Sequence, residues 1–267
     1  MVSAVLAVRV SPARVGAVAG RNVGALRSGP AYWLVLASGF FEPVLYLLSI
    51  GVGVGALVGE LRLEDGRTVG YAVFVAPAML AVSAMSGALS ETTFNFFFKM
   101  RYAKTFEAIL ATPVRPLEVA LGELAWALAR SALYTGAFLV VMTAMGLTRA
   151  GWALAAFPAA LLVGLAFGAV GMAVSTVMRG WQDFDLVSTG QFALFLFSGT
   201  FSPVGDYPPV LRAVVEAAPL FHAVELVRGL AAGLPGWGLA GHAAYLLVMA
   251  AVGLWVAARR LERVLCR

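Results

Sequence analysis

Charged side chains are scarce in this chain. Only 12% of its 267 residues are Asp, Glu, Lys or Arg, whereas 61% are apolar; a soluble domain carries about 25% charged residues. The mean hydropathy is +0.89, and the apolar residues fall in runs that reach the roughly 20 residues a helix needs to cross a bilayer core. The sequence therefore predicts an all-α integral membrane protein, with one transmembrane domain over 1–267 and no room for a separate soluble catalytic domain.

Cysteine and histidine are nearly missing. The single cysteine, Cys266, excludes a disulfide framework and a cysteine-based metal site, and His222 and His242 lie too far apart in the sequence for a metal-site spacing. The motif G-x-x-x-x-G-K-[ST] does not occur, and the glycine-rich run at 51–55 lacks its spacing. We therefore expect no catalytic, metal-binding or cofactor-binding residue here, and no ATP binding by this chain itself.

Six apolar stretches are long enough, or nearly so, to be membrane-spanning helices. They lie at about 31–58, 71–98, 119–147, 152–178, 186–201 and 238–258. The fifth is only marginally long enough. No polar linker or low-complexity segment divides them into domains.

A helix is also predicted before the first span, at 12–29. Ser11-Pro12 is a helix start signal and Gly29-Pro30 a stop. Val15 and Ala19 share one face at helical spacing with later apolar residues, while Arg14 lies on the opposite face. An amphipathic helix in the headgroup layer is the favoured interpretation, and a frayed cytosolic tail is the alternative.

The basic residues set the expected orientation. Thirteen Lys and Arg residues fall on the side of both termini and five on the other side, and basic residues concentrate in the cytoplasm. Both termini are therefore expected in the cytoplasm, with the chain in the inner (plasma) membrane. The net charge of +5 is read as topology and not as a nucleic-acid surface. Basic residues are 17 Arg to 2 Lys, which suggests a GC-rich bacterial source.

Four ionisable residues are predicted within or near hydrocarbon: Glu42, Glu91, Glu123 and Arg130. Each costs roughly 2.5–3.5 kcal/mol at a helix centre, so each should have a partner or face a polar cavity. Glu123 and Arg130 are seven residues apart, too distant for a direct bridge without a third group. Partners on other helices, or snorkelling to the interface, are favoured over a proton relay, which needs a more connected series of acids.

The connection at 99–116 holds a short helix candidate, 102–113. Phe106, Ile109 and Leu110 supply an apolar edge, and Lys104 and Glu107 are charged. Such an edge fits a rigid element that docks on another protein. It also fits a plain interface helix, and the residues alone leave both interpretations open.

The segment 203–235 is apolar but interrupted by prolines and glycines, so it cannot be one straight span. Two half-helices that dip into the outer leaflet fit better, and non-helical backbone at that depth must be buried in protein or line a cavity. His222, Glu225 and Arg228 are spaced by three on one helix face. The alternative to a functional cluster is a solvated intrahelical ion pair.

Four stretches together resemble the type-2 ABC exporter permeases, and most closely the branch of nodulation lipo-oligosaccharide and daunorubicin-resistance permeases. They read FEPVLYLLSIGVGVG (41–55), YAKTFEAILATPVRPLEVALGELAW (102–126), FSGTFSPVGDYPP (197–209) and APLFHAVELVRGL (218–230). The resemblance implies a permease of six spans that dimerises with itself or a paralogue and carries two separate ATPase subunits, which bind the ATP and Mg. It also implies that 102–113 is the coupling helix and that 203–232 holds re-entrant helices. No matched motif carries the choice of substrate; the expected cargo is a glycolipid, a lipid-linked oligosaccharide or a hydrophobic drug-like molecule.

Two other classes of protein fit the sequence less well. A secondary transporter or channel needs no ATPase, but the acids are sparse and no inverted repeat is evident. A membrane-embedded enzyme needs a convergent polar cluster, whereas Asp183 and Asp185 lie in a polar turn with no histidine nearby.

Overall fold

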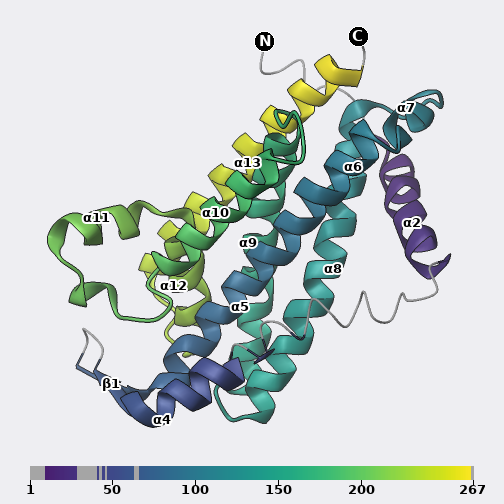
Figure 1. The fold of residues 1–267 in the computed structure, drawn as a ribbon. Helices are drawn as coiled ribbons and strands as arrows, with labels where there is room; N and C mark the ends of the chain where they lie inside the picture. Colours follow the sequence, from purple (N-terminus) through teal and green to yellow (C-terminus); the bar gives the residue numbers. More distant parts are fainter. Residues whose placement is uncertain (1–9, 29–40, 42–43, 46, 63–65, 266–267) are drawn as a thin grey trace.

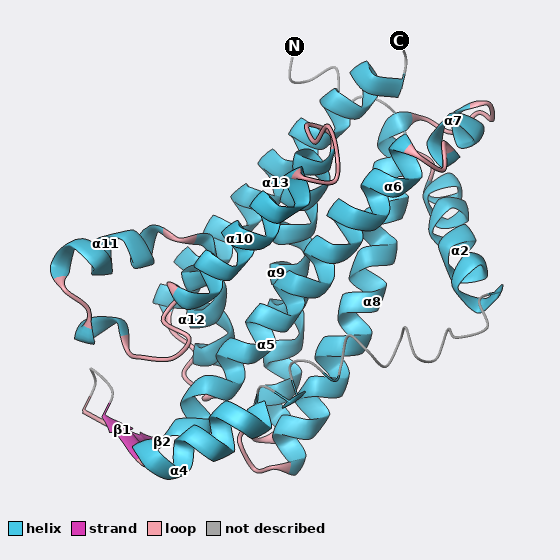
Figure 2. Cartoon of the chain, in the orientation of Figure 1, coloured by secondary structure: helices cyan, strands magenta, loops and turns pink. Residues whose placement is uncertain are grey.

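The computed structural model describes residues 10–28, 41, 44–45, 47–62 and 66–265. Figure 2 shows that this part of the chain is almost entirely helical, with one small pair of strands. The helices before residue 116 are α2 (Pro12–Ser28), a π-helix (Leu47–Val54), α4 (Gly55–Val58), α5 (Tyr71–Ser90), a second π-helix (Glu91–Asn95), α6 (Phe96–Arg101) and α7 (Thr105–Leu110). The later helices are α8 (Pro116–Ala144), α9 (Ala150–Ser175), α10 (Asp183–Leu196), a 3-10 turn (Val204–Asp206), α11 (Pro209–Ala217), α12 (Pro219–Ala231) and α13 (Trp237–Leu265).

Within the described part of the chain, four continuous helical stretches are long and apolar enough to cross a membrane: Tyr71–Arg101, Pro116–Ala144, Ala150–Ser175 and Trp237–Val264. They coincide with the predicted spans 71–98, 119–147, 152–178 and 238–258. Figure 1 shows them running side by side along the long axis of the molecule. The hydropathy prediction succeeds here because the bilayer imposes a length on each element.

The other two predicted spans are not matched by helices of bilayer length among the described residues. The predicted span 31–58 is described only in part, at 41, 44–45 and 47–58, and Glu42 lies outside the described residues. The span 186–201 corresponds to α10, which ends at Leu196 and has 14 residues, or about 21 Å of helix. That is shorter than a bilayer core of about 30 Å, so the count of six spans stays a prediction.

The two ends of the bundle differ in their secondary elements. One end carries α7 together with the last turns of α13 and is called the α7 end (Figure 1). The opposite end carries β1 (Glu60–Arg62) and β2 (Thr68–Gly70), which pair antiparallel with Leu61 opposite Val69, and is called the hairpin end. This antiparallel pair leads directly into α5.

The predicted re-entrant segment 203–235 folds as short helices. Pro208 directly precedes α11, and Pro219 is the first residue of α12. Pro209 and Pro219 stand at the first position of α11 and α12, where a proline costs no backbone hydrogen bond. α12 packs on α5, α9 and α13, and its apolar residues join the main core cluster. Whether the segment dips into the outer leaflet stays a prediction.

The contact between α9 and α13 is the closest approach of two helix backbones that involves a glycine. A β-carbon on Gly253 would lie 2.8 Å from both the carbonyl carbon of Ala169 and the amide nitrogen of Val170. Those atoms belong to the α9 backbone and cannot move without the helix. Small residues permit such an approach in membrane helices.

We expect Gly253→Ala to lower the free energy of unfolding by about 1–3 kcal/mol, because the added methyl group overpacks this contact. Thermal unfolding of the purified protein in detergent measures the loss. Gly241→Ala on the same helix is the matched control, since a β-carbon there meets nothing within 4 Å, and it should be neutral or slightly stabilising. Equal effects of the two substitutions would refute the proposed close contact.

Candidate functional site

The predicted coupling segment, 102–113, contains α7 over Thr105–Leu110 only. The helix starts abruptly because Lys104 adopts a left-handed conformation, with φ 49°. It ends where the Thr112 hydroxyl donates to the Ile109 carbonyl oxygen at 2.6 Å. The segment is therefore one short helix with a defined start and stop, held between α6 and α8.

The apolar edge of α7 faces its own chain. Phe106 is 0% exposed, and its ring lies 4.8 Å from that of Phe96, centroid to centroid. Ile109 and Leu110 are half-buried against the same cluster, which includes residues of α6, α8, α9 and α13. The Phe106 ring therefore packs α7 against the bundle, and the docking of this segment on a partner protein stays a prediction.

The charged edge of α7 faces outward. The side chains of Lys104 and Glu107 are 69% and 56% exposed, and their charged atoms lie 3.9 Å apart. An exposed pair at that distance contributes little to stability. These two residues are thus the part of the predicted coupling set that a partner protein can reach.

Glu91 is the centre of a buried polar network between the second π-helix and α8. One carboxylate oxygen accepts the Trp126 indole N–H at 3.0 Å, and the other accepts the Asn95 amide at 2.8 Å and a hydrogen bond from the Arg130 guanidinium. Arg130 also donates to the Tyr134 hydroxyl at 2.8 Å. The prediction that Glu91 and Arg130 need partners on other helices is met by this pair.

Lys99 extends the network to Glu123 and to α2. Its ammonium nitrogen lies 2.6 Å from a Glu123 oxygen, 3.0 Å from the Asn22 amide oxygen and 3.9 Å from a Glu91 oxygen. Among the described residues, the Asn22 amide nitrogen and the second Glu123 oxygen are buried without a hydrogen-bond partner. Glu123 and Arg130 are therefore linked through Lys99 and Glu91 and not directly, as their spacing predicted.

The sequence interpretation missed Lys99, Asn22 and Trp126. Lys99 was counted as part of a cytoplasmic connection, although it falls two helical turns after Glu91. A signal was available for Asn22, which shares the buried face of α2 with Val18. The indole of Trp126 gives no such signal, because nothing in the sequence distinguishes it from an ordinary apolar residue of a span.

α2 contacts α8 at two places along its length. The buried Glu118 carboxylate accepts the backbone N–H of Ser11 and that of Arg115, both at 2.9 Å, and lies 3.5 Å from Arg14. Further along, α2 approaches α8 so closely that a β-carbon on Gly122 would lie 2.6 Å from a Val18 side-chain atom. The predicted interface helix is thus packed on the bundle; its place in the headgroup layer stays a prediction.

An exposed face of hydroxyl groups and aromatic rings lies along α5 and α6. Ser90, Phe94, Phe98 and Tyr102 recur at intervals of four and are all exposed. The Tyr102 ring stacks on that of Trp181, with centroids 5.2 Å apart. We call these five residues the serine–aromatic face.

α10 lies beside this face and adds an amide group near it. The Gln191 side chain donates to the Ser86 hydroxyl at 2.8 Å, and of the residues in α10 only Phe195 is buried. A helix with so little buried surface is poorly anchored within one copy of the chain. Membrane lipid alone would favour a uniformly apolar surface there.

The predicted outward cluster on α12 divides into two pairs. Arg228 binds Glu225 at 2.5 Å, whereas His222 pairs with His242 of α13, Nδ1 to Nδ1, at 2.7 Å. Burial, and to a lesser degree the neighbouring imidazole, lower the pKa of His222. The intrahelical ion pair that the spacing of three allowed is present, but His222 is not part of it.

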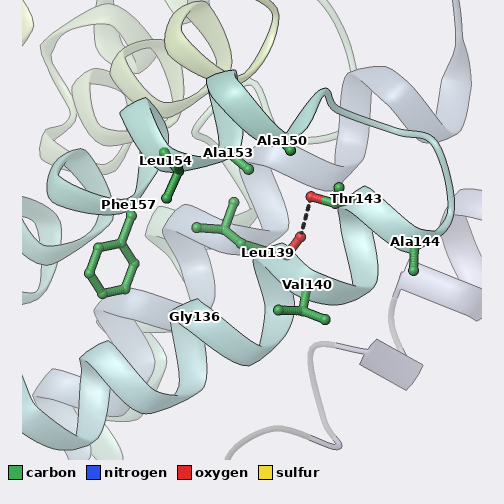
Figure 3. A pocket seen from close by; sticks show the side chains of 9 residues that line it. All are labelled: Gly136, Leu139, Val140, Thr143, Ala144, Ala150, Ala153, Leu154 and Phe157. Atoms are coloured by element: carbon green, nitrogen blue, oxygen red, sulfur yellow. Dashed lines mark hydrogen bonds between the residues drawn. The ribbon is translucent and has the colours of Figure 1, made fainter.

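An apolar groove of about 670 Å³ lies between α8 and α9 at the hairpin end (Figure 3). Leu139, Val140, Leu154 and Phe157 supply most of the side chains that Figure 3 draws around it. The hydroxyl of Thr143 is already bonded to the Leu139 carbonyl oxygen at 2.8 Å. The groove therefore offers hydrocarbon contacts and no directed polar group.

Comparison with known proteins identifies consistent relatives. The profile of a family described as ABC-2 type transporter matches residues 27–231. Nodulation protein J of Rhizobium leguminosarum bv. trifolii is 34% identical over 227 residues, which cover 85% of each chain. The proteins of that name from Sinorhizobium fredii and Bradyrhizobium diazoefficiens are 34% and 30% identical, over 83% and 70% of each chain.

Proposed function

The chain belongs to the ABC-2 type transporter family, in the branch of Nodulation protein J, and we propose that it is the permease of an exporter driven by a separate ATPase. As a member of this family it is the membrane subunit of an ABC transporter. The finer proposal is a complex of two permease copies and two ATPase subunits in the inner membrane, with the α7 end in the cytoplasm. Its cargo is an amphiphile such as a glycolipid, or a hydrophobic drug-like molecule.

The outward charged edge of α7 is the observation that carries this proposal. A chain without a nucleotide-binding motif can be driven by ATP only through a contact with the subunit that binds it, since a ligand shifts only states that it contacts differently. Lys104 and Glu107 are exposed on a helix whose opposite side is anchored by Phe106. A force applied at that edge moves the helix as a unit.

The buried network gives the contact a route into the membrane-spanning helices. α7 follows α6, which carries Lys99, and Lys99 joins α2, α8 and the second π-helix through Asn22, Glu123 and Glu91. The unused Asn22 donor and Glu123 acceptor supply hydrogen-bonding groups for a second arrangement. π-helical turns are frequent at functional sites, and this one begins at the network's centre.

The serine–aromatic face is the proposed wall of the export pathway, with a second copy of the chain supplying the opposite wall. Hydroxyl groups and aromatic rings suit a cargo that is polar at one end and apolar at the other. The shortness of α10 and its small buried surface also favour a neighbouring copy against it.

The test of this proposal is the charge reversal Glu107→Lys. We expect it to reduce co-purification of the proposed ATPase subunit by roughly tenfold, because it reverses the charge that this edge presents to the partner. Export from cells should fall in proportion. Folding should be unaffected, because the carboxylate is exposed.

Glu60→Lys is the matched control, since it reverses an exposed charge at the hairpin end. It should leave ATPase binding and export at wild-type levels. Undiminished co-purification and export with Glu107→Lys would show that the coupling contact lies elsewhere.

A further inference from the structure

A polar cavity of about 360 Å³ lies at the hairpin end, between β2, the start of α5, the loop at 203–204, α11 and α12. Its size is at the lower end of the range of small-molecule sites, roughly 300–1,000 Å³. Five charged side chains line it: Arg67, Arg212, Arg228, Glu216 and Glu225. It is distinct from the serine–aromatic face, which reaches toward the α7 end.

Arg228 forms a fixed wall of this cavity. Its guanidinium lies over the Phe74 ring at 4.0 Å, donates to the Gly199 carbonyl oxygen at 2.8 Å and binds Glu225 at 2.5 Å. The side chain is 14% exposed. Each terminal nitrogen of a guanidinium carries two N–H groups, so these bonds orient Arg228 and still leave donors for a ligand.

A second donor–acceptor pair comes from α11. The Arg212 Nε donates to Glu216 at 2.7 Å, and both side chains are half-exposed. Arg67 adds a third guanidinium from the hairpin. The formal charge of the five side chains is +1, from three arginines and two glutamates, and each glutamate lies against an arginine.

The mixture of arginines and glutamates in this cavity discriminates between anionic head groups and sugars. A phosphodiester or carboxylate head group only accepts hydrogen bonds, so in this cavity it can bind the arginines but is repelled by the two glutamates, whose charge has the same sign. A sugar hydroxyl donates and accepts, so neighbouring hydroxyls can bind an arginine and a glutamate at once. The Phe221 ring, which also lines the cavity, offers an apolar surface to the C–H face of a sugar ring.

We propose that this cavity binds a neutral carbohydrate head group, namely that of the exported amphiphile. The proposal rests on the proposed function, which places the hairpin end on the outer side of the membrane. The cavity then receives the head group after it has crossed, and retains it until the molecule leaves.

The test is direct binding to the purified chain in lipid nanodiscs, without its ATPase. Maltotriose, cellotriose and chitotriose are titrated separately, with inorganic phosphate as the anionic probe, and binding is followed by saturation-transfer NMR. We expect at least one of the sugars to bind, and phosphate not to compete. Arg228→Ala should weaken sugar binding by roughly tenfold or more, through loss of a charge-assisted hydrogen bond.

Glu216→Gln provides a second variant, because its side chain is half-exposed and its loss should not prevent folding. It should weaken sugar binding in the same direction. Arg62→Ala is the control: this exposed arginine is on β1, outside the cavity lining, and its loss should change nothing.

The outcomes separate this inference from the function on which it rests. Failure of all three sugars to bind, or phosphate binding in their place, overturns the carbohydrate site even if Glu107→Lys disrupts ATPase association as expected. Sugar binding that depends on Arg228 and Glu216 supports the site, and it does so even if no ATPase associates with the chain.

Discussion

Glu91→Ala is expected to lower the free energy of unfolding by about 3–5 kcal/mol, the cost of removing one partner from a buried ion pair. The substitution leaves the Arg130 guanidinium without its carboxylate, and it removes the acceptor of the Trp126 indole and the Asn95 amide. Glu91→Gln should cost less, because it keeps an acceptor oxygen and loses only the charge. Unfolding of the purified protein in mixed micelles, titrated with denaturing detergent, measures both.

Glu107→Ala is the control for this prediction. It removes a carboxylate from an exposed pair with Lys104, and such pairs contribute about 0–1 kcal/mol. If Glu91→Ala proved as mild as Glu107→Ala, the network around Glu91 would have no role in stability, and the proposed route from α7 into the bundle would lose its foundation.

Phe106→Ala is expected to destabilise the protein by about 3–5 kcal/mol, as truncation of a fully buried phenylalanine does. The ring is 0% exposed and packs on Phe96 in the cluster at the α7 end. ATPase association should fall only to the extent that α7 loses its packing against the bundle. Phe106→Leu should therefore keep most of the stability and most of the ATPase association.

Phe98→Ala is the matched comparison, since Phe98 lies on the neighbouring α6 and is 45% exposed. It should cost much less stability. Wild-type stability of Phe106→Ala combined with a complete loss of ATPase binding would instead show that the ring contacts the ATPase directly.

The features that could be predicted from the sequence are those that the bilayer requires of any spanning helix. Helices of bilayer length were predictable at 71–98 and 238–258 because hydrocarbon requires both apolar side chains and internally bonded backbone. The need for partners of Glu91 and Arg130 was predictable from the cost of burying charge. Their pairing was not, because it depends on how far α5 and α8 slide and turn against each other.

Helix α7 shows how far this region could be predicted from the sequence. Its existence and charged edge were predictable from the sequence at 102–113, and the resemblance assigned its role. Which side of a six-residue helix faces the bundle depends on its entry angle, which is set by the left-handed Lys104. A lysine gives no sign of that conformation in the sequence, so the burial of Phe106 could not be predicted from it.

The members of this network also become available in a fixed order during synthesis and membrane insertion. Arg130 follows Glu91 by 39 residues, so at about 5–20 residues per second the ribosome takes about 2–8 s to supply this partner. Lys99 leaves the ribosome only eight residues after Glu91, and its ammonium group lies within 3.9 Å of the Glu91 carboxylate. Of the two cations that lie against Glu91, Lys99 is therefore made first, and its shorter contact with Glu123 becomes available only once the first turns of α8 have been made.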